Sequence, residues 1–177
     1  MVRRPPALVV VSGPPAAGKT ALAEALRTRL ELPLIAKDTL KERLGEALEV
    51  RGREESRRLG AATFAVQFEV LRELLAAGVS VISEGNYDAS WFEALPEARI
   101  VQVHLTAPPG VLRARMLARA DGRHAVHYDR EAADEVHARA LGGEWAPLPI
   151  GGALLTLDTE PWPDMHAVAA QVESLLR

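Results

Sequence analysis

Residues 7–20 read Ala-Leu-Val-Val-Val-Ser-Gly-Pro-Pro-Ala-Ala-Gly-Lys-Thr, and this stretch decides the fold. Leu8 to Val11 is an unbroken run of apolar, mostly β-branched residues, which is typical of a buried strand. Further apolar residues then recur at helical spacing, namely Leu22, Ala23, Leu26 and Leu30. A buried strand that passes through a glycine-containing turn into a helix predicts an α/β fold.

The turn between this strand and this helix matches the pattern G-x-x-x-x-G-K-[ST], the P-loop or Walker A motif. Glycine lets backbone N–H groups face phosphate oxygens, where a Cβ would obstruct them, and the helix adds its positive end. Lys19 is expected to reach the β- and γ-phosphates of a nucleotide, and Thr20 to offer its hydroxyl to Mg²⁺. The alternative is a tight glycine turn without a ligand. The predicted nucleotide-binding residues of the loop are Gly13, Pro14, Pro15, Ala16, Ala17, Gly18, Lys19 and Thr20.

Length and composition indicate one globular domain that spans residues 1–177. Hydrophobic residues make up 48% and charged residues 25% of the chain, which is a globular rather than a disordered balance. The formal net charge of −3 gives no overall attraction to nucleic acid. The chain has no Cys, and no apolar run approaches the length of a membrane span or a signal peptide. We therefore expect a cytoplasmic protein without disulfides.

The rest of the chain alternates between short apolar runs and longer stretches with helical periodicity. This alternation predicts a five-stranded parallel sheet with helices on both faces. After the first strand, the expected strands cover residues 33–36, 79–83, 100–105 and 153–157. After the first helix, the expected helices cover residues 40–48, 55–77, 88–94, 108–120, 131–141 and 165–176, and Gly78 is a typical C-terminal cap.

Two carboxylates follow predicted strands, at the edge of the sheet where α/β proteins bind ligands. Asp38 follows the strand at 33–36, and it lies near the P-loop if that strand and the first one are sheet neighbours. Its alternative role is that of an N-cap for the next helix. Glu84 follows the strand at 79–83, and it could hold Mg²⁺ through water, meet the substrate, or be a polar turn residue. Asp38 could also reach the metal through water.

Two basic regions could act on a charged ligand. The helix at 108–120 places Arg115 and Arg119 on one face, and residues 121–130 follow it with Arg, Gly and two His but no apolar period. We interpret 121–130 as a mobile lid, with a plain surface connection as the alternative. The second region, residues 51–58, could meet a phosphorylated or acidic substrate, but a solvated surface is the favoured interpretation.

Taken together, the P-loop, the strand-end Asp38 and the arginine-bearing helix with its lid resemble the small P-loop kinases and phosphotransferases. That group includes gluconate and shikimate kinases, the kinase domain of 5′-polynucleotide kinases, chloramphenicol phosphotransferase and zeta-type toxins. The resemblance spans most of the chain in order. It implies a single P-loop kinase domain that uses ATP and Mg²⁺, with residues 38–77 as the substrate-binding region.

The resemblance also implies roles for individual residues. In that group a strand-end Asp acts on the acceptor hydroxyl, and Asp38 is its match. Asp38-x-x-Lys41 looks like the acidic-then-basic pair of polynucleotide kinases, while Arg119 and Arg123 match the adenine-side and lid arginines of shikimate-kinase-like members. The expected catalytic residues are then Lys19, Asp38, Arg119 and Arg123. Arg115 and Arg119 would assist nucleotide binding, and the expected acceptor-binding residues are Asp38, Lys41, Glu84 and Tyr87.

These observations predict an ATP- and Mg²⁺-dependent phosphotransferase that acts on a hydroxyl of a small molecule. A 5′-hydroxyl polynucleotide kinase is the second interpretation, and a nucleotide-dependent regulatory ATPase or switch is the third. Glu84-Gly-Asn-Tyr-Asp replaces the Asp-Gly-x-Pro-Arg of nucleoside-monophosphate kinases, so a nucleoside-monophosphate substrate is disfavoured. The chain has no Asn-Lys-x-Asp guanine signature, so a GTPase is disfavoured as well. The acceptor, the oligomeric state and the choice between Asp38 and Glu84 as the base stay open at this point.

Overall fold

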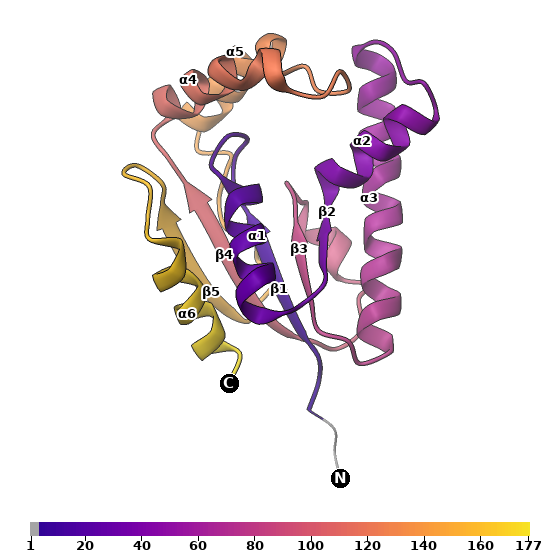
Figure 1. Ribbon diagram of the computed structural model, residues 1–177, viewed down its shortest axis with the longest axis vertical. Coiled ribbons are helices and arrows are strands. Elements are labelled where there is room, and N and C mark those ends of the chain that lie inside the picture. The colour runs from indigo at the N-terminus through magenta and orange to yellow at the C-terminus, as the bar shows by residue number, and fades with distance from the viewer. Residues whose placement is uncertain (1–3) are drawn as a thin grey trace.

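The structure, a computed structural model, describes residues 4–177 as alternating strands and helices (Figure 1). The strands are β1 (Ala7–Ser12), β2 (Leu34–Ala36), β3 (Val81–Glu84), β4 (Arg99–Thr106) and β5 (Ala153–Asp158). The α-helices are α1 (Lys19–Leu30), α2 (Lys37–Ala47), α3 (Arg53–Ala76), α4 (Pro109–Arg119), α5 (Asp129–Leu141) and α6 (Met165–Leu175). Two 3-10 helices, η1 (Ala89–Phe92) and η2 (Ala120–Gly122), complete these elements, and η1 stands where a helix was predicted over 88–94.

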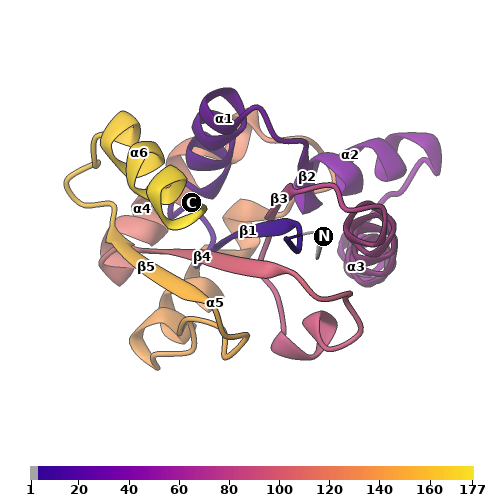
Figure 2. The same ribbon diagram turned by 90° about the horizontal axis from the view of Figure 1, so that it is seen from below.

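The five strands form one parallel sheet in the order β2-β3-β1-β4-β5, which confirms the predicted architecture. The central strand is β1, and all its residues are buried. Val9 and Val11 pack in the cluster that holds α1 and α6, while Leu8 and Val10 pack in the cluster that holds α3. Figure 2 shows α1 and α6 together on one side of the sheet. The apolar run in β1 is thus explained by burial on both faces.

Asp38 was expected near the P-loop on the condition that β2, the strand before it, pairs with β1. That condition is not met, because β2 and β1 are not neighbours in the sheet. β3 lies between the two strands and pairs with both. Its register puts Glu84 directly beside Val11 of β1. Strand order depends on how whole crossover units pack, which the periodicity of single segments does not report. Glu84 therefore ends the strand next to β1, whereas Asp38 follows β2, which lies one strand farther away.

The N-cap interpretation of Asp38 is also wrong. α2 begins at Lys37, directly after β2, so Asp38 lies inside the first turn of the helix. Ala36 occupies the cap position and makes no side-chain cap hydrogen bond. By contrast, Gly78 follows α3 with a φ of +77°, as its prediction as a cap requires.

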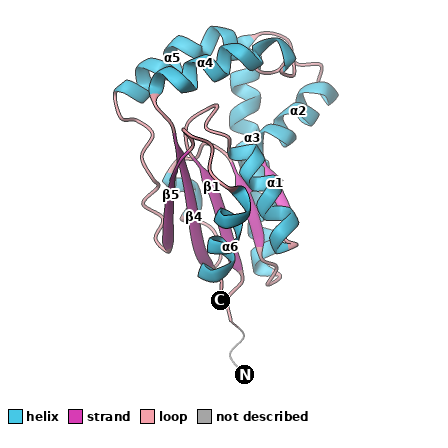
Figure 3. Cartoon of the chain, turned by 60° about the vertical axis from the view of Figure 1, so that its left-hand side comes forward, coloured by secondary structure: helices cyan, strands magenta, loops and turns pink. Residues whose placement is uncertain are grey.

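The predicted lid segment is partly helical. η2 ends at Gly122 and α5 begins at Asp129, so only residues 123–128 are irregular. Figure 3 shows α4 and α5 lying across the end of the sheet, above the P-loop. None of the helices within residues 4–177 is both long and apolar enough to cross a membrane.

Candidate active site

A cavity of about 450 Å³ lies between the P-loop, the α2–α3 pair and the α4–α5 pair. It sits at the carboxyl ends of the strands, where ligands bind in open parallel sheets. Of the residues predicted for the site, those that line it are Pro15, Ala16, Gly18, Lys19, Thr20, Asp38, Lys41, Glu84, Arg119 and Arg123. The predicted residues that do not line it are Gly13, Pro14, Ala17, Tyr87 and Arg115.

The P-loop packs so closely on its neighbours that two of its glycines have no room for a side chain. Gly13 has a φ of +133°, and a Cβ there would overlap the carbonyl of Leu105 in β4. Gly18 has a φ of +92°, and a Cβ there would overlap the ring of Trp162. Both backbone conformations also disfavour any residue other than glycine. Sequence reasoning missed Trp162, whose only signal is its place between two prolines after the last strand.

Lys19 lies across the loop as a buried cation. Its Nζ donates hydrogen bonds to the carbonyl oxygens of Gly13, at 3.0 Å, and Pro14, at 2.9 Å. Burial lowers the pKa of Lys19, and the nearby Glu84 carboxylate opposes that shift. Neutral carbonyls leave most of the lysine charge uncompensated, so an anion such as phosphate would be a stronger partner.

Asp38 is surrounded by cations from two elements. Its Oδ1 accepts from Lys37 Nζ at 3.3 Å, and its Oδ2 accepts from the Arg123 guanidinium at 2.9 Å. Burial raises the pKa of Asp38, but the charges of Lys37, His127 and Arg123 outweigh it and hold that pKa well below its usual range. Asp38 is therefore ionised across the physiological pH range. A hydroxyl donor that displaced Arg123 would find a strong acceptor there.

Glu84 has the opposite environment. The residue is 3% exposed at the end of β3, and its Oε2 has no hydrogen-bond partner among the described residues. Burial raises the pKa of Glu84 to about 7, with Lys19 opposing. Thr20 lines the same cavity. Carboxylate and hydroxyl oxygens suit Mg²⁺, which usually takes its remaining ligands from water and phosphate.

Residues 4–177 contain no group of three or more His, Asp or Glu side chains that could hold a metal by themselves. A magnesium ion here would therefore depend on nucleotide oxygens and water for most of its ligands. Thr20 and Glu84 are the protein groups that fit this task, because one is a hydroxyl and the other a buried carboxyl without a partner.

The segment predicted as a lid, residues 121–130, packs against α2 and α3. Val126 is 2% exposed and lies against Gly45 of α2. Its carbonyl accepts from Ser56 Oγ of α3 at 2.7 Å, and His127 Nε2 lies 2.8 Å from Glu42 Oε1. Together with the pair between Arg123 and Asp38, these contacts connect this segment to the predicted substrate-binding region.

The two arginines of α4 that were predicted to assist nucleotide binding, Arg115 and Arg119, point in different directions. Arg119 lines the cavity, and its Nε donates to Asp129 Oδ2 at 2.6 Å. Arg115 instead donates to the carbonyl oxygen of Thr159 at 2.8 Å, and its guanidinium lies 5.9 Å from the ring centroid of Trp162. The predicted nucleotide-side arginine Arg115 is therefore tied to the loop between β5 and α6.

Tyr87, predicted to meet the acceptor, packs against the core cluster on the α3 side of the sheet. Its hydroxyl lies 2.7 Å from Ser83 Oγ and accepts from Gln67 Nε2 at 3.0 Å. Its ring packs edge to face against Phe64 and Phe68, and burial raises the pKa of Tyr87 well above its usual value. From the sequence alone, an aromatic residue just after a strand, such as Tyr87, could equally pack in the core or contact a ligand.

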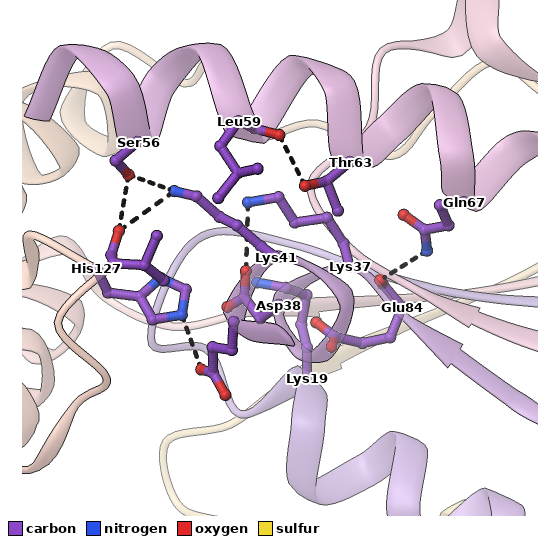
Figure 4. Close-up of polar contacts among 12 residues, drawn as sticks. Lys19, Lys37, Asp38, Lys41, Ser56, Leu59, Thr63, Gln67, Glu84 and His127 are labelled. Carbon is purple, nitrogen blue, oxygen red and sulfur yellow. Dashed lines mark hydrogen bonds and ion pairs between the residues drawn. The ribbon is translucent and has the colours of Figure 1, made fainter. Parts of the chain in front are cut away.

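Several residues that line the cavity were not among the predicted site residues, although four of them lie in the predicted substrate-binding region (38–77) or lid (121–130); they are Lys37, Arg53, Ser56, Arg57, Asn86 and His127. The segment at 51–58 is divided, since Arg53, Ser56 and Arg57 line the cavity but Arg58 does not. The interpretation of the whole segment as a solvated surface is therefore wrong for its cavity-facing side. Helical spacing explains the division, because positions 53, 56 and 57 share one face of α3. Figure 4 shows Ser56 and Lys41 reaching toward each other from α3 and α2.

The chain is similar to proteins with the same architecture. Residues 8–141 match the family model described as an AAA domain. A "putative kinase" of Chloroflexus aurantiacus j-10-fl is 33% identical, with a TM-score of 0.87 over 98% of this chain and 100% of that one. A shikimate kinase from Bacteroides thetaiotaomicron has 21% identity and a TM-score of 0.56 over 96% and 98% of the chains. A gluconokinase from Sinorhizobium meliloti 1021 has 18% identity and a TM-score of 0.55 over 98% and 93%. No curated protein matches the chain.

Proposed function

The chain belongs to the small P-loop kinases of the AAA-domain family, and from this membership we propose that it is an ATP- and Mg²⁺-dependent phosphotransferase. Its acceptor would be a hydroxyl of a small molecule. The observation that carries the proposal is the shared cavity, which joins Lys19 and Thr20 of the P-loop to the ionised Asp38 of α2. A phosphate donor and a hydroxyl acceptor bound there would face each other.

Phosphoryl transfer asks the protein mainly for positioning and charge neutralisation. Lys19 would hold the transferring phosphoryl group, and Arg119 and Arg123 would neutralise charge from the lid side. Thr20 and Glu84 would hold Mg²⁺, which when bound neutralises the phosphate oxygens. Asp38 would accept a hydrogen bond from the acceptor hydroxyl and aim its oxygen at the γ-phosphorus. The new bond joins that oxygen to phosphorus as the bond to ADP breaks.

The pairing of Arg123 with Asp38 has a consequence for this sequence of events. While the two are paired, Asp38 is a weak proton acceptor because its pKa is low. If the phosphates of ATP attract Arg123, Asp38 loses one of its cationic neighbours and its pKa rises, while the stronger influence of Lys37 stays in place. Donor binding would then free Asp38 to receive the acceptor hydroxyl and, late in transfer, its proton.

The test is a screen of hydroxyl compounds with ATP and Mg²⁺, in which phosphorylated products are detected by mass. The Lys19→Ala protein should stay folded and lose at least a hundredfold in turnover, by analogy with removal of one preorganised donor. Arg27→Ala, an exposed change on the same helix, is the control and should keep full turnover. Equal turnover in Lys19→Ala and wild type would overturn the assignment.

The regulatory switch is the less favoured function on structural grounds. A switch needs a nucleotide site and a surface for its partner, but it does not need an acceptor carboxylate inside the nucleotide cavity. Here Asp38 and Lys41 line that cavity beneath the lid. This placement is expected of an enzyme that holds a second substrate.

A further inference from the structure

We propose that the acceptor carries a carboxylate or phosphate group, which binds at Lys41 while the reacting hydroxyl lies at Asp38. This inference rests on the proposed phosphotransferase function and narrows its substrate class. The two residues are three positions apart on α2, so their side chains leave the same face of the helix. The hydroxyl and the anionic group of the acceptor would therefore be only a few bonds apart.

Lys41 is a buried cation without a carboxylate partner. The residue is 8% exposed, and it lines the cavity. Its Nζ donates to Ser56 Oγ at 2.7 Å and to the carbonyl oxygen of Val126 at 3.4 Å, and no carboxylate of residues 4–177 lies within 4.0 Å of it. Figure 4 shows this side chain between α2 and the lid. Burial, helped by the charge of Lys37, lowers the pKa of Lys41 to about 8. An anionic ligand would relieve the cost of this uncompensated charge.

The surrounding wall also has more positive than negative groups. Arg53 and Arg57 share one carboxylate, that of Glu135, at 3.0 and 3.9 Å. Among residues 4–177, Asp38 is the one carboxylate within 4.0 Å of Lys37, and Asp38 is also bound by Arg123. The nucleotide phosphates would engage the cations on the P-loop side of the cavity. The excess of positive charge on the α2–α3 side of the cavity is thus left for the second substrate.

A purely structural role for Lys41 is the competing explanation, since it links α2, α3 and the lid. The two explanations differ in whether an added anion binds when the nucleotide site is already full. Inorganic phosphate and acetate are suitable probes, because one mimics a phosphate ester and the other a carboxylate. The protein would first be saturated with a non-hydrolysable ATP analogue and Mg²⁺, and melting would then be followed at constant ionic strength.

We expect at least one probe to raise the melting temperature of the wild-type complex and to have little effect on Lys41→Met. Arg57→Met, which changes an exposed side chain and leaves the core intact, should weaken the effect as well. Arg58→Met removes a charge from the same helix outside the cavity and is the matched control, with a wild-type response expected. A response to phosphate alone would indicate a phosphate ester, and a response to acetate would indicate a carboxylate.

Turnover provides a second readout once an acceptor is found. For an anionic acceptor, Lys41→Met should raise KM by roughly tenfold to a hundredfold, the range for losing a hydrogen bond to a charged group. Neutral acceptors preferred over their carboxylate and phosphate derivatives, or equal probe responses in wild type and Lys41→Met, would overturn the inference but not the kinase assignment. Failure to bind the ATP analogue would overturn both.

Discussion

At the residue scale, Asp38 is the group whose charge matters most to the proposed reaction. Asp38→Asn keeps its size but removes the charge that Lys37 and Arg123 now bind. We expect turnover to fall by roughly a hundredfold or more, the usual range for loss of a general base, with ATP affinity little changed. Steady-state kinetics and nucleotide titration would check both values. Full turnover in the variant would move the role of base to Glu84.

The same residue offers a check on its local structural role. Because Asp38 makes no cap hydrogen bond, Asp38→Ala and Asp38→Asn should have free energies of unfolding within about 0.5 kcal/mol of each other. Chemical denaturation of the two variants measures this difference. A cap would make Asp38→Ala clearly the less stable of the two.

Glu84 should make the stability of the protein depend on pH. Its pKa is about 7 in the folded state and near 4.5 when unfolded. Between these values the unfolded chain loses the proton first, so the Glu84 contribution lowers the free energy of unfolding as pH rises and is constant above about 7. Glu84→Gln should remove this trend, and its stability relative to wild type should grow by up to roughly 3 kcal/mol across the window. Urea unfolding at pH 4.5, 6 and 8 would test this, and parallel curves would contradict it.

At the element scale, the lid is the part expected to respond to nucleotide. Residues 123–128 are held to α2 and α3 by side-chain contacts, such as His127 with Glu42, rather than by pairing with the sheet. Such contacts open at a lower free energy than a core strand does. We expect slower amide hydrogen exchange of residues 121–130 when an ATP analogue and Mg²⁺ are bound. Amides of β1 are the internal control, and equal protection of the lid in both states would argue against closure.

Val126 of the predicted lid packs directly against Gly45 on the surface of α2. A Cβ on Gly45 would lie 3.0 Å from Val126 Cγ2, which is tighter than ordinary packing. Alanine is favoured over glycine inside a helix by about 1 kcal/mol, so the helix itself would tolerate the change. A bulkier residue at position 45 would instead disturb the packing of Val126 against α2. This contact explains why a glycine stands in the middle of α2.

At the scale of the whole molecule, polynucleotide is not expected to be the main substrate. A chain of phosphates needs a row of free cations and binds less tightly as salt increases. The formal net charge is −3, and aromatic residues, on which bases would stack, are only 5% of the chain. Labelling of a 5′-hydroxyl oligonucleotide should be weak compared with that of the best small acceptor. Efficient labelling that salt suppresses would contradict this prediction.

The local chemistry of the sequence was sufficient for the elements and for the P-loop. A strand buried on both faces needs an apolar run, which Leu8–Val11 provides. A phosphate-binding loop needs glycine where a Cβ has no space, as at Gly13 and Gly18, so both features can be recognised from a few neighbouring residues. The five parallel strands followed from the same local patterns.

Only the tertiary structure decided which side chains meet. The insertion of β3 between β1 and β2 placed Glu84 beside the P-loop strand, and the packing of α3 brought Arg53, Ser56 and Arg57 to the cavity. It also turned Arg115 toward Thr159 and packed Tyr87 against the core. Periodicity shows which face of an element is apolar, but strand order and helix docking arise from contacts between residues far apart in the chain. Those contacts determine the partners, burial and charge of each group, and so they determine that Asp38 is ionised while Glu84 holds its proton up to a pH of about 7.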